Sequence, residues 1–386
     1  MIRTLTNVSV FLSLIFYLGI YIKYKGMIEL EKIVSKFKIN GNIVSINPLI
    51  SGLVNKTYLV TTTTNKYLLQ KINKYVFKNP VDVMENIDKI TKHLKEKTQP
   101  TLNIVRCNDM IFYYDDKEDE YYRMYEYMEN CCNVEEVDNK ISIEVGKAIS
   151  KFQCLLFDYN PEELVETIHN FHHLSSRIKQ LNIAYNSLKD DDLRKIETNN
   201  LYNYIMKEYL NNLEIEKLIE TDIIPIRVVH NDTKLNNIMF DSDNKKAVAM
   251  IDLDTVMPGT ILYDFGDVIR STVSNSDENE INLDKVYYND SFFTSLTAGY
   301  LSNMYNKLTY DEVKELTNSV GVITLECATR FLTDYLNKDV YFRIEYPKHN
   351  LNRAYNQITL YKDFLKKKKK WNNIVYNLYN RFILNI

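Results

Sequence analysis

Glycine is scarce in this chain, with 9 residues in 386. A loop that binds phosphate through its backbone amides usually contains several glycines, so such a loop must work here with very few. The cysteines are odd in number and contain no CxxC pair; they are Cys107, Cys131, Cys132, Cys154 and Cys327. This pattern argues against a cysteine metal site or a disulfide scaffold and favours a reducing compartment.

The chain also lacks an excess of either charge. Its formal net charge is -3 and its pI is near 6.1, which gives no signal for nucleic acid as a partner. Hydrophobic residues make up 45% and charged residues 26%, as in ordinary globular proteins. A length of 386 residues fits two lobes that share a cleft.

One long apolar run stands near the start of the chain, from Val8 to Ile22. Counted from residue 5, it is just long enough to cross a bilayer with its flanks, and no A-x-A-like cleavage site follows. Lysines after the run, beginning with Lys23 and Lys25, would keep the body of the protein in the cytoplasm, tethered to the inner face of the membrane by residues 5–22. Two alternatives stay open: Met27 is the true start, so residues 1–26 are not native, or the run is a buried core helix.

The rest of the chain changes character near residue 130. Residues 27–130 are strand-rich, with β-type runs around residues 42–46, 57–61, 66–72, 110–114 and 121–125, and a helix that begins at Asn79-Pro80. Residues 131–386 are mainly helical, interrupted by one hairpin near residue 240. The pattern predicts an α+β protein with a small antiparallel β lobe followed by a larger helical lobe.

The most informative stretch is His230-Asn231-Asp232, followed by Asn237 and, after an apolar hairpin, by Asp252-Leu253-Asp254. Phosphoryl transfer needs a carboxylate near the attacking hydroxyl and oxygen ligands that hold Mg²⁺ against nucleotide phosphates. The spacing H-x-D-x-x-x-x-N places a carboxylate and an amide at opposite ends of one loop, and the hairpin returns the chain to the same place.

These side chains predict a kinase site that uses ATP and Mg²⁺. Asp232 would accept or orient the hydroxyl proton, while Asn237 and Asp252 would bind the metal. Asp254 would help with a second ion or with the phosphates, on the same side of an extended segment as Asp252. The alternative is that both stretches are ordinary acidic turns; their combination after a β lobe favours the catalytic interpretation.

At this point the sequence resembles the aminoglycoside phosphotransferase/choline kinase superfamily, which has a protein-kinase-like two-lobed fold. The likeness is closer to its N-acetylhexosamine 1-kinase-like branch. The stretches that carry it lie between about Gly41 and Leu360, and include residues 51–58, 69–73, 230–237, 251–259, 262–267, 330–335 and 339–342. The resemblance implies phosphorylation of the anomeric hydroxyl of an N-acetylhexosamine.

Carried over by position, Asp232 looks like the catalytic base and Asp252 like the metal ligand. Arg330 and Tyr341 look like residues on the substrate side. An arginine fork can hold sugar hydroxyls or an anionic phosphate in fixed geometry. The alternative is that Arg330 is a helix-surface residue paired with Glu326, four positions earlier, but the substrate role is favoured.

The nucleotide side departs from the family pattern. The loop that would cover the phosphates has a single glycine, Gly52, and backbone amides from Gly52 to Asn55 remain candidates for phosphate contact. Of the neighbours Gln70 and Lys71, only one can face the cleft; phosphate chemistry favours Lys71 and family position favours Gln70. Glu85, on the next helix, is either the ion-pair partner of Lys71 or an exposed surface residue.

Two further residues complete the predicted substrate side. Asp267, in the run Tyr263-Asp264-Phe265-Gly266-Asp267, is a candidate for substrate contact, whereas Asp264 is expected to brace the catalytic loop. His172 is a candidate to reach the sugar, although a buried, hydrogen-bonded histidine is the commoner outcome.

The sequence therefore predicts a kinase for a small molecule, with a sugar favoured as acceptor. The alternatives are a kinase for another small alcohol, such as an aminoglycoside, choline, ethanolamine or homoserine, and a non-catalytic, membrane-tethered binding protein on the same scaffold. The sequence carries no signal for an oligomeric state.

Overall fold

The computed structural model describes residues 28–49 and 54–384. The chain divides into two compact units. The first contains the described residues up to Pro80 together with Leu102–Met128, and the second contains Val81–Thr101 together with the chain from Glu129 onward. Within the described residues, every helix is too short or too polar to cross a membrane. The apolar segment predicted at residues 5–22 lies outside them.

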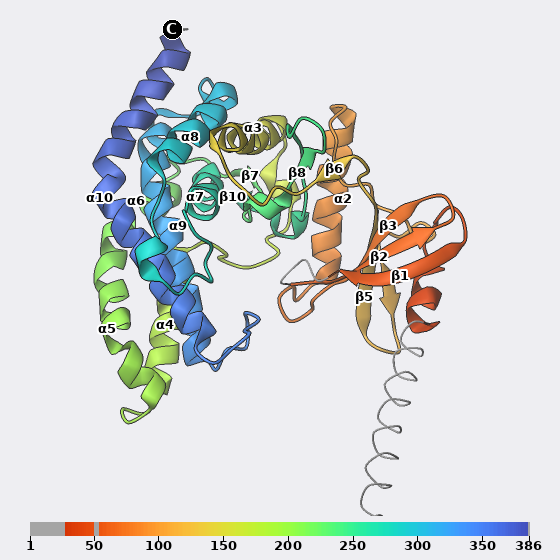
Figure 1. Cartoon of the computed structure of the whole chain (residues 1–386), viewed down its shortest axis with the longest axis horizontal. Helices are drawn as coiled ribbons and strands as arrows, with labels where there is room; N and C mark the ends of the chain where they lie inside the picture. Colours follow the sequence, from red (N-terminus) through yellow and green to blue (C-terminus); the bar gives the residue numbers. More distant parts are fainter. Residues whose placement is uncertain (1–27, 50–53, 385–386) are drawn as a thin grey trace, which may run out of the picture. The chain divides into compact units, whose positions relative to one another are not determined.

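The first unit is built on a five-stranded antiparallel sheet in the order β1-β2-β3-β5-β4 (Figure 1). Its strands are β1 (Ile43–Leu49), β2 (Lys56–Thr62), β3 (Lys66–Lys71), β4 (Tyr113–Asp115) and β5 (Glu120–Glu126). Because successive side chains on a strand face opposite sides, one face gathers Val60, Leu69 and Met124, which are all fully buried. The helical residues 28–34 supply Val34 to the same core.

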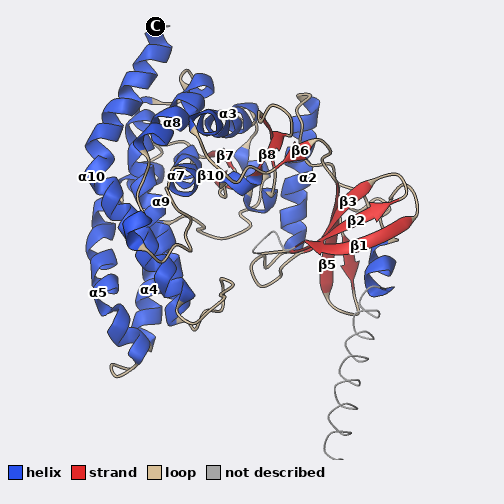
Figure 2. Ribbon diagram, viewed as in Figure 1, coloured by secondary structure: helices blue, strands red, loops and turns tan. Residues whose placement is uncertain are grey.

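The second unit is mainly helical (Figure 2). Its helices are α2 (Pro80–Glu96), α3 (Asn139–Leu155), α4 (Leu174–Ser187), α5 (Leu193–Glu208), α6 (Glu214–Glu220), α7 (Ile261–Thr272), α8 (Asp290–Met304), α9 (Tyr310–Leu336) and α10 (His349–Leu384). Helix α9 begins with a capping box in which Thr309 and Glu312 exchange hydrogen bonds, and most of its length is buried. It packs against α7, α4 and α10, so it forms the centre of this unit.

Several of the few glycines lie where helices approach closely. A Cβ atom on Gly146 of α3 would come 2.1 Å from the carbonyl oxygen of Leu296, and one on Gly299 of α8 would come 2.2 Å from that of Ile143. The two helices therefore pack backbone against backbone, which only glycine allows. Gly146 and Gly299 are therefore required for the close packing of α3 against α8.

Short strands in the second unit carry the segments of functional interest. Strand β7 (Arg227–Val229) pairs with β10 (Met257–Gly259), and β8 (Ile238–Asp241) pairs with both β6 (Cys131–Cys132) and β9 (Ala247–Met250). The predicted hairpin near residue 240 is confirmed as β8 and β9. The predicted α+β class, with a small antiparallel sheet and a larger helical part, is confirmed as well. All five cysteines are free thiols.

Candidate active site

The loop from His230 to Asn237 connects β7 to β8 and is tied to the end of β9. Nε2 of His230 donates a 2.9 Å hydrogen bond to the carbonyl oxygen of Ile251, and the amide of Ile251 donates one of 2.9 Å to the carbonyl oxygen of Asn237. His230 is fully buried. These bonds hold the loop beside the residue that follows β9, Asp252.

Asp232 presents its carboxylate to two donors of the same loop. Its Oδ2 lies 2.8 Å from Nζ of Lys234 and 2.8 Å from Nδ2 of Asn237. Nδ2 of Asn237 also donates to the backbone carbonyl of Asp232 at 2.8 Å. Burial raises the pKa of Asp232, but Lys234 and the hydrogen bonds outweigh burial and leave the pKa below its ordinary value. The carboxylate is therefore ionised at neutral pH.

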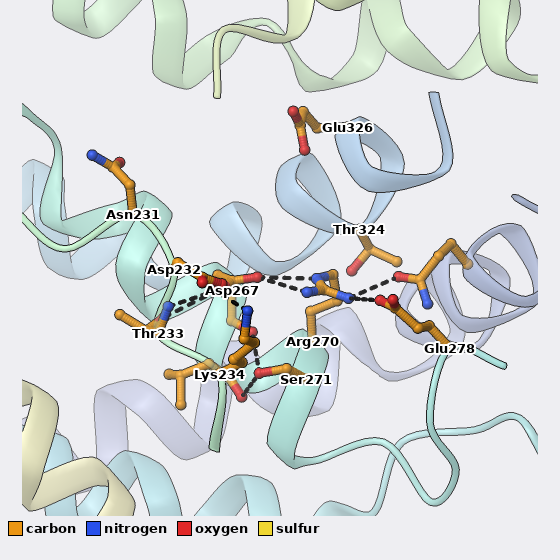
Figure 3. Close-up of polar contacts among 12 residues, drawn as sticks. Asn231, Asp232, Thr233, Lys234, Asp267, Arg270, Ser271, Glu278, Thr324 and Glu326 are labelled. Atoms are coloured by element: carbon orange, nitrogen blue, oxygen red, sulfur yellow. Dashed lines mark hydrogen bonds and ion pairs between the residues drawn. The ribbon is translucent and has the colours of Figure 1, made fainter. Parts of the chain in front are cut away.

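Lys234 is a member of the site that the sequence interpretation missed. Burial lowers its pKa, but Asp232 and Asp252 together raise the pKa above its ordinary value. Its ammonium is therefore a fixed positive charge near both carboxylates. Figure 3 shows it beside Asp232. The signal was present in the sequence, because a lysine two residues after the predicted base lies in the same loop.

Asp264 braces the loop from behind, as the sequence led us to expect. Its Oδ1 accepts the amide of Asn231 at 2.7 Å, and its Oδ2 accepts the amide of His230 and Nε2 of Gln153, both at 3.0 Å. Burial raises the pKa of Asp264, and His230 and these hydrogen bonds offset part of the rise. Asn231 has φ of 62°, a left-handed conformation that asparagine tolerates and that the bonds to Asp264 stabilise.

Asp267 lies one helical turn further along α7 and faces the same loop. Its Oδ2 accepts the amide of Thr233 at 2.9 Å, and its Oδ1 receives Nη2 and Nε of Arg270 at 2.9 and 3.1 Å (Figure 3). The side chain of Asp267 is buried. Because both oxygens are engaged by protein groups, this geometry favours a bracing role over the substrate contact predicted for Asp267.

The segment after Asp252 differs from the extended chain that was predicted. Asp252 has φ of 58° and ψ of 58°, and Leu253–Thr255 form a turn of 3₁₀ helix. The argument that Asp252 and Asp254 share one side of a strand is therefore wrong, since strand alternation does not apply to a helical turn. Asp252 is partly exposed, whereas Asp254 is 4% exposed and its carbonyl accepts the hydroxyl of Thr167 at 3.1 Å.

The donor set of the loop suits a magnesium ion. Asn237 uses its Nδ2 on Asp232, and its Oδ1 accepts no hydrogen bond from the described residues, so this oxygen is open to a cation. An amide oxygen, one or two carboxylates and nucleotide phosphates are the ligands Mg²⁺ prefers. Within residues 28–49 and 54–384, no group of three or more His, Cys, Asp and Glu side chains is arranged to hold a metal. The predicted metal ligands are instead the side-chain amide of Asn237 and the carboxylates of Asp252 and Asp254.

On the predicted substrate side, Glu326 of α9 brings His172 and Arg330 together. Its Oε2 lies 3.7 Å from Nδ1 of His172, and its Oε1 lies 3.7 Å from Nε of Arg330 and 3.3 Å from Nε of Arg177. The expected pairing of Arg330 with Glu326 is confirmed, but Glu326 is buried rather than on the helix surface. His172 is also buried, and its Nε2 donates to the carbonyl oxygen of Asn231 at 2.9 Å.

Tyr341 is held beside Arg330 by a buried carboxylate. Oδ1 of Asp334 accepts the amides of Val340 and Tyr341 at 3.0 and 2.8 Å, and Oδ2 accepts the amide of Phe342 at 2.9 Å. The guanidinium of Arg330 consequently lies 5.6 Å from the ring centre of Tyr341 and 5.2 Å from that of Phe342. The structure thus brings His172, Arg330 and Tyr341 into one cluster.

The predicted nucleotide residues of the first unit have local partners. Nζ of Lys71 lies 2.7 Å from Oε1 of Glu120 at the start of β5. The neighbouring Gln70 accepts Nε of the buried Arg123 at 2.9 Å. Lys71 is half-buried and its side chain leaves the sheet on the side opposite to Gln70.

The remaining nucleotide candidates lie in a loop and on α2. Gly52 lies outside the described residues. Oδ1 of Asn55 accepts the amide of Asn73 at 2.9 Å, which fixes the end of the loop against the chain after β3. Glu85 is exposed on α2. The roles of all three in nucleotide binding stay predictions.

Fold and loop geometry together define a kinase-like phosphotransferase. The chain belongs to the phosphotransferase enzyme family, whose model matches residues 45–292, more than half of its length. The predicted class of enzyme is thereby confirmed. The narrower likeness to N-acetylhexosamine 1-kinases stays a prediction.

Solved structures of small-molecule kinases share the fold at low sequence identity. Spectinomycin phosphotransferase in complex with ADP and spectinomycin is 11% identical, with a TM-score of 0.57 over 88% of this chain and 98% of that one. Choline kinase from Cryptosporidium parvum is 14% identical, with a TM-score of 0.54 over 86% and 91%. Amicoumacin kinase in complex with AMP-PNP, Ca²⁺ and Ami is 12% identical, with a TM-score of 0.54 over 83% and 88%. The predicted kinase-like fold is confirmed.

Proposed function

We propose that this phosphotransferase moves the γ-phosphate of ATP to a hydroxyl group of a small molecule, and that the acceptor is the anomeric hydroxyl of an N-acetylhexosamine. The observation that carries the proposal is the position of the Asp232 carboxylate, whose Oδ2 lies 2.8 Å from both Nζ of Lys234 and Nδ2 of Asn237. A carboxylate fixed in this way is the group that phosphoryl transfer to an alcohol requires.

In the proposed reaction the acceptor oxygen attacks the γ-phosphorus of ATP while the bond to the β-phosphate oxygen breaks. The hydroxyl proton passes to the carboxylate of Asp232, and ADP leaves with the bridging oxygen. Lys234 offsets negative charge beside the transferred group, because its ammonium stays protonated next to Asp232. Asp264 and Asp267 keep the loop in place through the amides of His230, Asn231 and Thr233.

Mg²⁺ would be held by Oδ1 of Asn237 and the carboxylate of Asp252, with Asp254 nearby. When bound, the ion neutralises charge on the nucleotide phosphates. In support, related folds have been solved with ADP and with AMP-PNP and Ca²⁺. In the first unit, Lys71 and Asn55 remain the candidates for nucleotide binding.

The charge of the predicted acceptor side favours a sugar over a cationic alcohol. Arg177 and Arg330 both lie there, and a choline or aminoglycoside site needs acidic residues instead. The second candidate function is a kinase for an amino alcohol, which the shared fold with choline and aminopropanol kinases supports.

A substrate panel tests the proposal. ADP release would be measured with N-acetylglucosamine, N-acetylgalactosamine, kanamycin, choline and homoserine, in the wild-type chain and in Asp232→Ala. We expect turnover with an N-acetylhexosamine, lowered by several orders of magnitude in the variant while nucleotide binding survives. Turnover only with cationic acceptors would exclude the sugar assignment. An unimpaired variant would remove Asp232 from its proposed role.

A further inference from the structure

The carboxylate of Glu326 lies between two guanidinium groups. Its Oε1 lies 3.3 Å from Nε of Arg177 and 3.7 Å from Nε of Arg330, and its side chain is 1% exposed. Among the described residues, no other carboxylate lies within 4 Å of either guanidinium. The arginine cluster formed by Arg177, Glu326 and Arg330 therefore carries a net charge of about +1, in a place where buried charges are normally balanced.

The excess positive charge of the cluster affects the pKa of Arg177. Burial and the neighbouring Arg330 hold the pKa of Arg177 below its ordinary value, even though Glu326 opposes them. The N–H groups of Arg177 are engaged structurally, since Nε and Nη2 donate to the carbonyl oxygen of Phe171 and Nη1 donates to Gln180. Arg177 thus adds charge to the cluster without being free to contact a ligand.

Arg330 is the member of the cluster that can contact a ligand. Its guanidinium lies 4.9 Å from the ring centre of Phe171 and also faces the rings of Tyr341 and Phe342, which fix its plane. Its side chain is 17% exposed, and Tyr341 is 37% exposed beside it. Aromatic faces orient a cation but do not neutralise it, so the positive charge remains effective at the exposed edge.

The arginine cluster is joined to the catalytic loop through one side chain. His172 contacts Glu326 through Nδ1 and donates from Nε2 to the carbonyl oxygen of Asn231, the residue before Asp232. The charges of the loop itself cancel, because Asp232 is paired with Lys234. Asp252 and Asp254 lie on the proposed metal-binding side, where a divalent cation would offset them, so the arginine cluster supplies the excess positive charge on the predicted acceptor side.

We propose that the arginine cluster makes the acceptor site charge-selective: it admits neutral or anionic acceptors and excludes acceptors that carry an ammonium group. The inference rests on the proposed function and adds a substrate class to it. Repulsion of the wrong ligand is a common source of specificity, and a like charge in a partly desolvated site is strongly disfavoured.

Three sugars that differ only at one nitrogen test the inference. Glucosamine carries an ammonium, N-acetylglucosamine a neutral amide and N-sulfoglucosamine an anionic sulfamate. We expect kcat/KM for glucosamine, below the pKa of its amine, to be at least about tenfold lower than for the other two, with the gap narrowing as salt rises. Raising the pH until the amine is neutral should recover much of the loss.

Substitutions at position 330 separate charge from shape. Arg330→Gln should reduce the difference in kcat/KM between glucosamine and N-acetylglucosamine several-fold. Arg330→Lys keeps the charge and should leave this difference unchanged, even where KM rises. Arg343→Gln is the matched control, because Arg343 is exposed in the same segment and its removal should leave the gap unchanged. Thermal unfolding of each variant shows whether the fold is retained.

A second matched pair distinguishes failure of the inference from failure of the proposed function. Choline and its uncharged carbon isostere, 3,3-dimethylbutan-1-ol, differ only in charge; turnover is measured for both, and calorimetric binding for any acceptor that is not turned over. If no hexosamine is turned over or bound, the proposed acceptor is wrong. The comparison of choline with 3,3-dimethylbutan-1-ol then tests the charge selectivity by itself. The inference is overturned if the cationic compound of either set is turned over or bound as well as its uncharged analogue or better. It is also overturned if no compound of either set binds.

Discussion

The ammonium of Lys234 lies 2.8 Å from Oδ2 of Asp232, so the proposed base and a fixed cation share one loop. The contact opposes the effect of burial and keeps the pKa of Asp232 below its ordinary value. A base with a lowered pKa remains ionised, and hence competent, further into the acid range. In the proposed mechanism, the pair therefore sets the acid limit of activity as well as the charge beside the transferred phosphoryl group.

Replacing Lys234 by Met should lower kcat by about 100-fold, since a preorganised charge at the transferred group is lost. It should also raise the pKa of Asp232, so that the acid limb of the kcat/KM profile moves to higher pH. Lys234→Arg keeps the positive charge and should leave this limb near its wild-type position, even if turnover falls. A Lys234→Met profile that coincides with wild type in its acid limb would show that the ammonium does not act on Asp232.

The bracing role of Asp264 predicts a loss of stability that is larger than for an ordinary surface acid. Asp264→Ala removes the acceptor of three buried N–H groups, on His230, Asn231 and Gln153. Leaving buried donors unsatisfied should lower the free energy of unfolding by about 3 kcal/mol. Asp284→Ala, on an exposed turn, serves as control and should change it by no more than about 0.5 kcal/mol. Urea unfolding measures both; equal midpoints for the two variants would argue against the brace.

Gly266 lies where α7 packs closely against α9. A Cβ atom there would come 2.5 Å from the carbonyl oxygen of Ser319 and 2.9 Å from Cγ1 of Ile323. Because the first obstacle is backbone, Gly266→Ala should push the helices apart and cost about 1–3 kcal/mol of unfolding free energy. It should also lower kcat, since Asp264 and Asp267 lie on the same helix and hold the loop. An alanine variant with wild-type stability would mean that the helices can separate freely.

Much of the candidate site was predictable because it is local in sequence. The spacing from Asp232 to Asn237 and the hairpin that returns the chain to Asp252 depend only on short-range pattern, and β8 and β9 formed as expected. The bracing of the loop by Asp264 followed from its position in a tightly packed run. Lys234 could have been found by the same local argument.

What the sequence did not reveal depends on backbone conformation or on distant contacts. Strand alternation failed after β9 because Asp252 adopts a left-handed conformation, which local pattern does not encode for an aspartate. The ion pair of Lys71 with Glu120 arises from the pairing of β3 with β5, whose register joins residues far apart in the chain. Similarly, helical spacing links Glu326 to Arg330, but only the tertiary fold brings Arg177 to the same carboxylate.

The buried carboxyl of Glu326 makes the free energy of unfolding fall as the pH is lowered. Burial alone would raise its pKa, but Arg330, His172 and Arg177 lower the pKa of Glu326 to about 2 from an ordinary value near 4.5. A carboxyl whose pKa is lower in the folded state contributes stability above its unfolded value, and this contribution is lost as pH falls toward the folded value. A shift of this size corresponds to about 3 kcal/mol, present at neutral pH and lost between about pH 5 and pH 2.

Glu326→Gln should therefore lower the free energy of unfolding by about 3 kcal/mol at pH 7, because Arg177 and Arg330 lose the one carboxylate that the described residues place beside them. The deficit relative to wild type should shrink toward pH 3, since the wild-type carboxyl is by then losing its advantage. Glu220→Gln, on an exposed position of α6, is the control and should run parallel to wild type throughout. Urea unfolding at a series of pH values measures all three chains. A constant gap between Glu326→Gln and wild type from neutral to acid pH would contradict the assignment, because the ionised carboxylate would then contribute nothing through its charge.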